Sequence, residues 1–237
     1  PDLNNCSLAI IGLGYVGLPL ALQFELSNKN SHQKRKVIGF DINRKRIAQL
    51  KNGIDTTNEI SKEDINSLKN IYFTYDTEKL IKADVFIVTV PTPIDECNKP
   101  NLKPLIDATR TVGKALKDRL KNISPDKNLS TPVIIYESTV YPGATEEICV
   151  PIIYEESALE LNNLETNKGF VCGYSPERIN PGDKKHKLTD IIKVTSGSNS
   201  ITSEWIDNFY NSIIKAGTFK AINIKIAEAA KVIENTQ

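Results

Sequence analysis

The sequence predicts an α/β fold built on a doubly wound, parallel sheet. Short apolar runs rich in valine and isoleucine alternate with longer stretches whose apolar residues recur every three or four positions. A glycine-rich turn lies between the first apolar run and the first helical stretch. Alternation of this kind is typical of a parallel sheet that is covered by helices on both faces.

The predicted elements follow one another regularly along the chain. We expect strands at residues 7–11, 36–40, 71–74, 85–90, 132–136, 170–173 and 192–195. We expect helices at residues 18–27, 44–52, 61–69, 104–120, 145–161 and 203–215. A last helical pattern begins at Ile224 and continues to Gln237 without a cap or a breaker.

These elements suggest one large domain followed by the start of another segment. We assign residues 1–222 to the domain that contains the sheet and residues 223–237 to the start of a long connecting helix. Because that helix has no stop signal, we expect it to be cut short and to lead to a further domain that is absent here.

The composition excludes several classes of protein. A net charge of +1, with 25% charged and 40% hydrophobic residues, is that of an ordinary globular protein and not of a nucleic-acid binder. No apolar run approaches the roughly 18 to 20 residues of a membrane span. The four cysteines are scattered, without the paired spacing of a disulfide framework or a metal site. We therefore expect a cytoplasmic protein with reduced thiols, no bound metal and no membrane partner.

The glycine-rich turn carries the strongest chemical signal. Gly12, Gly14 and Gly17 follow the first strand and open the first helix, with Tyr15 and Val16 between them. The first glycine supplies a tight turn, the second lets a pyrophosphate approach the backbone, and the third lets helix and strand pack closely. The helix N-terminus would then hold the phosphates. This pattern predicts a dinucleotide site, although the glycines could instead only shape a turn.

Asp41 ends the second strand at the distance expected for a carboxylate that binds a ribose. A carboxylate here would repel a 2′-phosphate, which favours NAD over NADP. Asp41 could also be only a strand-end cap. Arg46 complicates the preference, because it could reach a 2′-phosphate, lie beside the ribose or be an exposed helix residue.

Two later strand ends add residues to the expected cofactor groove, since ligands bind beyond the carboxyl ends of parallel strands. Pro91, Thr92 and Pro93 form a stiff loop that either lines the groove or is only a rigid turn. Ser138 and Thr139 place two hydroxyls at the next strand end. Thr139 could orient a water or a substrate oxygen, or it could make a helix-entry hydrogen bond.

Three residues are candidates for the chemistry itself. Glu177 follows a strand in a rigid, polar loop and is the candidate general base, with a surface ion pair to Arg178 as the alternative. Lys231 and Asn235 lie four residues apart and would share one face of a helix. They could both stabilise a developing oxyanion, or they could be an ordinary exposed pair.

Taken in order, five segments resemble the signature segments of the UDP-glucose/GDP-mannose dehydrogenase family. They are residues 12–19, 91–93, 137–147, 173–183 and 227–237, and they span nearly the whole chain. Residues 136–143 and 174–183 are most similar to the branch that oxidises UDP-N-acetylglucosamine or its galactose epimer for capsule, O-antigen and Vi-antigen synthesis. The resemblance implies a Rossmann-like NAD-binding domain, a nucleotide-sugar substrate and a homodimer formed through the central helix.

The resemblance also implies a reaction. Members of this family oxidise C6 of the sugar to a carboxylate in two NAD-dependent steps, through an aldehyde and then a thioester on a cysteine. By this resemblance Thr139 and Glu177 would handle water and protons, and Lys231 and Asn235 would hold the oxygen that becomes negatively charged.

Two departures from the family pattern matter. The UDP-glucose branch has a second glutamate four residues after the one matching Glu177, whereas here that position is Pro181, which argues against plain UDP-glucose. None of the four cysteines stands in the sequence context of the family's nucleophile, so we expect this chain alone not to form the acid. Two alternatives stay open: a stand-alone dinucleotide-binding module, and a related single-step hydroxyacid dehydrogenase.

Overall fold

The structure, a computed structural model, describes residues 1–30, 33–67, 70–94, 100–122, 129–165, 167–178 and 188–236. The strands are β1 (Ser7–Ile11), β2 (Lys36–Phe40), β3 (Tyr72–Thr74), β4 (Val85–Val88), β5 (Val133–Tyr136), β6 (Glu160–Leu161), β7 (Gly169–Tyr174), β8 (Lys193–Gly197) and β9 (Thr218–Lys220). The α-helices are α1 (Gly17–Asn30), α2 (Arg44–Lys51), α3 (Lys62–Ser67), α4 (Lys103–Lys121), α5 (Val150–Ser157), α6 (Ser200–Asn211) and α7 (Ile224–Thr236). Short helical turns occupy η1 (Thr77–Lys82), η2 (Thr145–Cys149) and η3 (Leu188–Asp190).

The strands form one sheet in the order β3-β2-β1-β4-β5-β7-β8-β9, with β6 beside β7. The chain moves outward from β1 to β3 and then returns to place β4 on the other side of β1. The winding direction therefore reverses between β1 and β4, which is where this type of sheet opens a crevice for a ligand. The α/β, doubly wound prediction is confirmed.

The sheet is not parallel throughout, which corrects the prediction at one edge. β7 and β8 pair antiparallel, while β8 and β9 pair parallel with each other. A parallel pair needs a long crossover, usually a helix. Between β7 and β8 the described residues contain only the short turn η3, whereas α6 provides such a crossover from β8 to β9. The sequence analysis did not predict β9 or the short β6.

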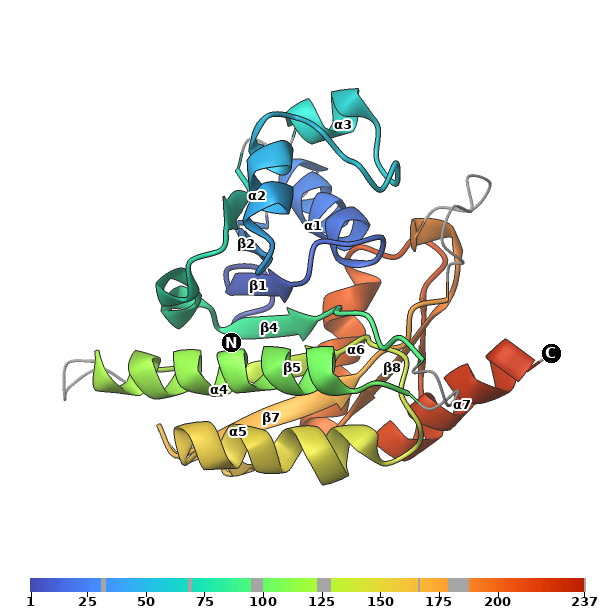
Figure 1. The fold of residues 1–237 in the computed structure, drawn as a ribbon. Helices are drawn as coiled ribbons and strands as arrows, with labels where there is room; N and C mark the ends of the chain where they lie inside the picture. The colour runs from blue at the N-terminus through green and yellow to red at the C-terminus, as the bar shows by residue number, and fades with distance from the viewer. Residues whose placement is uncertain are drawn as a thin grey trace.

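Alternating side chains of the central strands build two cores. Leu8 and Ile10 join the core on the face of α1 and α6, while Ala9 and Ile11 join the core on the face of α4 and α5. Figure 1 shows α4 and α5 crossing the sheet together on one face and α6 on the opposite face. Full burial of one such isoleucine or leucine side chain is worth about 1.5 to 3 kcal/mol.

One predicted helix, at residues 145–161, is instead three different segments. Residues 145–149 form a π-type turn, α5 ends at Ser157, and Ala158 has a left-handed backbone with φ 61° before β6 begins. Pro151 has no backbone N–H and cannot continue a regular hydrogen-bond ladder from the preceding turn. The apolar spacing did not reveal either interruption.

Candidate cofactor and active site

The three glycines of the turn between β1 and α1 have three different surroundings. Gly12 adopts φ +96°, and its carbonyl accepts a hydrogen bond of 2.7 Å from the Thr89 hydroxyl. A Cβ on Gly17 would lie 1.9 Å from the Gly12 oxygen, so no side chain fits there. A Cβ on Gly14 would meet no protein atom within 4 Å. Gly12 and Gly17 therefore shape the turn, while Gly14 leaves its outer side open.

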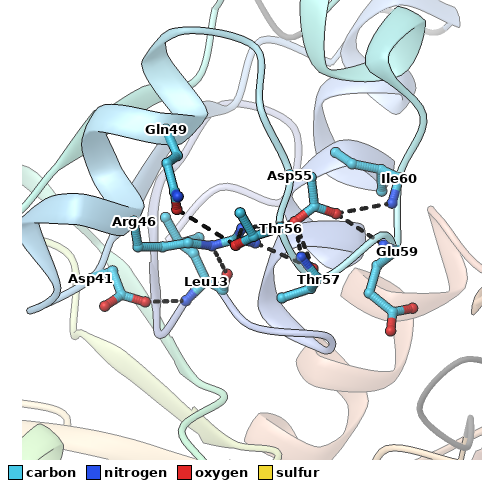
Figure 2. Close-up of polar contacts among 9 residues, drawn as sticks. All are labelled: Leu13, Asp41, Arg46, Gln49, Asp55, Thr56, Thr57, Glu59 and Ile60. Carbon is cyan, nitrogen blue, oxygen red and sulfur yellow. Dashed lines mark hydrogen bonds and ion pairs between the residues drawn. The ribbon is translucent and has the colours of Figure 1, made fainter.

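Asp41, at the end of β2, lies directly against this turn. One carboxylate oxygen accepts a hydrogen bond of 2.9 Å from the Leu13 N–H (Figure 2). The other accepts one of 2.8 Å from the Asn43 N–H. Asn43 in turn caps α2 through its own side chain. The acidic side chain and the glycine turn are thus held together, as a dinucleotide site requires.

A cavity of about 530 Å³ opens beside these groups, at the carboxyl ends of β1, β2 and β4. Its volume falls within the range of small-molecule and cofactor sites. Of the predicted cofactor residues it is lined by Gly12, Gly14, Tyr15, Asp41 and Pro91. Val16 and Gly17 are buried and lie outside this lining. The crevice is therefore open and is not filled by the protein's own side chains.

The far wall of the cavity comes from residues that the sequence analysis missed. Asn101 and the first half of α4 face the glycine turn across the crevice, and the residues concerned are Asn101, Lys103, Pro104, Asp107, Ala108 and Thr111. The lining is completed by Ile11, Phe40, Ile42, Thr89 and Val90. Thr89 and Val90 follow β4 and could have been identified by their place at a strand end. No motif marks the α4 residues, because their position depends on how α4 packs on the sheet.

Arg46 is not an exposed helix residue, because only 7% of its surface is accessible. Its Nε donates a hydrogen bond of 2.9 Å to the Leu13 carbonyl, and its Nη1 lies 2.7 Å from the Asp55 carboxylate (Figure 2). Arg46 lies outside the residues that line the cavity. It holds the glycine turn through the Leu13 carbonyl without lining the crevice.

The loops after β4 and β5 are bonded to each other. The Thr92 hydroxyl donates to the Thr139 carbonyl at 2.6 Å, and the Ser138 hydroxyl donates to the Val90 carbonyl at 2.6 Å. Pro93 is exposed beside them and does not line the cavity. Thr139 is exposed and does not cap a helix, since the next helical residue is Ala144. These bonds hold the predicted Pro91–Pro93 loop and the Ser138–Thr139 pair together at one sheet edge.

Glu177 follows β7 and is buried, with 8% of its surface exposed. Its carboxylate lies 3.7 Å from the ammonium group of Lys193, whose Nζ also lies 2.7 Å from the carboxylate of Glu137. Tyr210 donates a hydrogen bond to the other oxygen of Glu137. The sequence analysis missed this buried group, because its members come from four separate elements and form no motif.

The alternative interpretation of Glu177, a surface ion pair with Arg178, is wrong. The Arg178 guanidinium pairs with Glu234 of α7 and donates to the Ile192 carbonyl at 3.0 Å, while its backbone N–H donates to Glu177 at 2.8 Å. Burial and the negative charges of Glu177 and Glu59 raise the pKa of Tyr15. The glycine turn follows β1 and Glu177 follows β7, and β1, β4, β5 and β7 pair parallel, so both lie at the carboxyl ends of these strands.

Lys231 is buried at 9% exposure on α7, so the ordinary exposed pair is wrong for this residue. Burial lowers the pKa of Lys231, while the charges of Glu234 and Glu177 oppose that shift. Three residues earlier, Glu228 is fully buried and accepts a hydrogen bond of 2.9 Å from the Thr145 N–H. The backbone of Asn235 belongs to α7, and its side chain lies outside the described residues.

Two classes of site find no support in the part of the chain that the structure describes. No cluster of three or more histidine, cysteine, aspartate or glutamate side chains could hold a metal ion there. None of its helices has both the length and the apolar character that a bilayer-spanning segment needs.

Comparison with known proteins identifies the family. Residues 6–214 match the model of the UDP-glucose/GDP-mannose dehydrogenase family, NAD binding domain. The chain is 50% identical over 235 residues to the UDP-N-acetyl-D-glucosamine 6-dehydrogenase of Pseudomonas aeruginosa, covering 99% of this chain and 50% of that protein. It is 51% identical to Protein CapL of Staphylococcus aureus, covering 98% and 49%. The chain thus spans about half the length of these curated relatives.

The fold is also that of a solved relative. The NDP-N-acetyl-D-galactosaminuronic acid dehydrogenase of Methanosarcina mazei superposes with a TM-score of 0.81 at 24% identity, covering 98% of this chain and 47% of that one. The family match covers most of the chain and includes the glycine turn, the open crevice and the buried Glu177. The chain therefore belongs to the UDP-glucose/GDP-mannose dehydrogenase family and carries its NAD-binding domain.

Proposed function

We propose that this chain is the NAD-binding half of an enzyme that oxidises C6 of a UDP-N-acetylhexosamine to the uronic acid for bacterial surface polysaccharide synthesis. One observation carries the proposal: the open crevice beside Asp41 and the buried group around Glu177 both lie at the carboxyl ends of the parallel strands, at the same edge of the sheet. The relatives that are about 50% identical include UDP-N-acetyl-D-glucosamine 6-dehydrogenases, which supports the substrate class.

The residues of the crevice fit NAD. The open side of Gly14 would let a pyrophosphate reach the start of α1, and Asp41 would accept hydrogen bonds from the adenosine ribose. Tyr15, Pro91 and the Thr92–Ser138–Thr139 contact region would border the nicotinamide end. When bound, NAD accepts a hydride from C6 of the sugar.

The buried and helical groups would do the proton chemistry. Glu177 would accept or donate a proton, and Thr139, which is exposed at the strand end, would orient the water or sugar oxygen. Lys231, with Asn235 one turn further along α7, would stabilise the oxygen that gains negative charge as hydride leaves C6.

The acid-forming step needs a thiol that forms and releases a thioester. Cys6, Cys149 and Cys172 are buried in the two cores and are unsuitable for attack on a sugar aldehyde. Cys97 lies outside the described residues. We therefore propose that this chain by itself binds NAD but does not complete the reaction, and that a further segment supplies the thiol.

The same proposal covers the arrangement of the whole enzyme. Residues 1–222 would form the NAD-binding domain, and residues 223–237 would begin a helix that leads to a sugar-nucleotide domain and a homodimer interface. The exposed Ile226 and Ile233 on α7 support this assignment, because they offer apolar surface for a partner. We place the enzyme in the cytoplasm, in keeping with its nucleotide cofactor and its reduced thiols.

Calorimetry of this chain with NAD, NADP and UDP-sugars tests the proposal. We expect NAD binding, weaker NADP binding and little affinity for a UDP-sugar alone. Tight binding of a UDP-sugar without NAD would contradict the proposal that this half binds NAD and that a further domain binds the sugar nucleotide. In the longer protein, two NADH per UDP-N-acetylhexosamine are expected, whereas one per sugar would indicate a single-step dehydrogenase.

A further inference from the structure

Both backbone polar groups of Leu13 are held by side chains of opposite charge. Asp41 accepts from its N–H, and Arg46 donates to its carbonyl, each at 2.9 Å (Figure 2). Asp41 lines the cavity, whereas Arg46 does not. Arg46 and Asp41 thus contact the same residue, but only Asp41, the carboxylate that would bind the ribose, borders the cavity.

Asp55 neutralises that cation. Its carboxylate lies 2.7 Å from the Arg46 guanidinium, and the two side chains are 1% and 8% exposed. The Arg46 contacts with Thr56 and Thr57 are longer, at 3.4 Å each, so Asp55 is its closest partner. Buried from water, such a pair is screened much less by salt than an exposed one.

The Asp55 carboxylate is itself fixed in place. It accepts hydrogen bonds from the Thr57 N–H at 3.0 Å, the Thr57 hydroxyl at 2.6 Å, the Glu59 N–H at 2.9 Å and the Ile60 N–H at 3.2 Å. Burial acts to raise the pKa of Asp55, but the bonds from Thr57, Arg46 and Ile60 prevail and hold it below its usual value. The negative charge therefore stays beside Arg46 at neutral pH.

We propose that Asp55 contributes to cofactor selection in this domain, by holding Arg46 neutralised against the Leu13 carbonyl, outside the cavity lining, so that Asp41 faces the 2′ position without a compensating charge. A 2′-hydroxyl can donate to Asp41, whereas a 2′-phosphate would meet an uncompensated carboxylate. This inference rests on the proposed NAD site. It assigns to a loop residue outside the glycine motif a part of the preference for NAD.

The two cations that precede Arg46 on α2, Arg44 and Lys45, stay constant in the test. The Arg44 guanidinium lies over the Tyr75 ring, 4.8 Å from its centre. Lys45 is exposed. Neither is altered in the variants below, so a change in selectivity reports on the Arg46–Asp55 pair.

The test is calorimetry of this chain with NAD and with NADP, expressed as the ratio of the two dissociation constants. We expect Asp55→Asn, which keeps the shape and part of the hydrogen bonding, to shift the ratio toward NADP by about tenfold. Arg46→Gln should shift it the other way, because Asp55 then adds a negative charge. In the double variant R46Q/D55N, the shift toward NADP that D55N causes should disappear. Asp118→Asn, which removes an exposed carboxylate 3.2 Å from Lys121, is the matched control and should change nothing.

An unchanged ratio in D55N with NAD binding intact would overturn this inference alone. A gain that persists in R46Q/D55N would also overturn it, because the effect would not act through Arg46. Should D55N fail to fold, judged by its unfolding curve, Arg46→Gln decides: a ratio that stays constant or moves toward NADP refutes the inference. A wild-type chain that binds neither nucleotide would overturn the proposed function together with it.

Discussion

Replacing Lys193 with methionine should destabilise the domain strongly, because Lys193 is the cation of a buried group. Its side chain is 3% exposed, that of Glu137 is 0% exposed, and their charged atoms lie 2.7 Å apart. Removing one partner of a buried pair leaves an uncompensated charge, which typically costs about 3 to 5 kcal/mol. Methionine has nearly the volume of lysine, so the loss should come from charge and not from a cavity. We expect a loss of about 3 kcal/mol at pH 7.

The pH dependence of this loss has a defined sign. Burial raises the pKa of Glu137, and Lys193 opposes that shift. Without Lys193 the Glu137 pKa should rise further, so the folded variant binds a proton more tightly than the unfolded chain. Stability of the variant should then increase as pH falls from 7 toward the ordinary glutamate pKa, and the difference from the wild type should shrink.

Urea unfolding followed by circular dichroism measures the effect, and a loss of this size corresponds to roughly 6 to 12 °C in Tm for a domain of this length. The double variant E137Q/K193M should recover about 2 kcal/mol, because no buried charge is then left in the pair. Lys225→Met removes an exposed lysine 3.0 Å from Glu147 and should leave stability unchanged. The reasoning is refuted if K193M unfolds like the wild type, or if the double variant is no more stable than K193M.

Three further predictions concern the turn, the start of α7 and the thiols. Gly17→Ala should lower the unfolding midpoint, because its Cβ would lie 1.9 Å from a backbone oxygen, whereas Gly14→Ala should keep the midpoint and weaken NAD binding by about tenfold in calorimetry. Equal loss of stability in both would contradict the separate roles given to them. Glu228→Ala should lower the free energy of unfolding by about 2 kcal/mol, since it leaves the buried Gly143 and Thr145 N–H groups without an acceptor. Hydrogen exchange at the Thr145 N–H should become faster, and an unchanged exchange rate there would contradict this role of Glu228. Burial raises the pKa of Cys6 to about 11, that of Cys149 to about 12 and that of Cys172 further, so a thiol reagent at pH 8 should label these three only after unfolding.

The sequence predicted the elements whose local patterns are strong. The first two strands match their predicted bounds, because each is a short apolar run bounded by polar or glycine residues. The glycine turn was interpreted correctly in shape, since Gly12 and Gly17 have the strained and crowded surroundings that only glycine tolerates. By contrast, α6 begins three residues before its predicted start, because Asn199 caps it with a side-chain bond to the Thr202 N–H.

What the sequence did not predict depends on contacts between distant residues. Glu137 and Lys193 lie 56 positions apart, and each has the appearance of an ordinary surface residue until the sheet buries both. Arg46 was considered for a cofactor contact, but its pairing with Asp55 follows from the loop after α2, for which no periodic pattern exists. The roles proposed for Glu177, Thr139, Lys231 and Asn235 remain predictions that activity measurements must test.

The anchoring of α7 has a mechanical consequence. Glu228 accepts hydrogen bonds from the Gly143 and Thr145 N–H groups, which connects the first turns of α7 to the start of η2. Arg178 pairs with Glu234 and so holds a later turn of α7. Lys231 lies between these two contacts, so α7 holds it in a fixed position relative to the domain that contains the glycine turn. In a longer protein, a hinge that moves a second domain would therefore have to follow Glu234, and Lys231 would keep its position relative to the glycine turn.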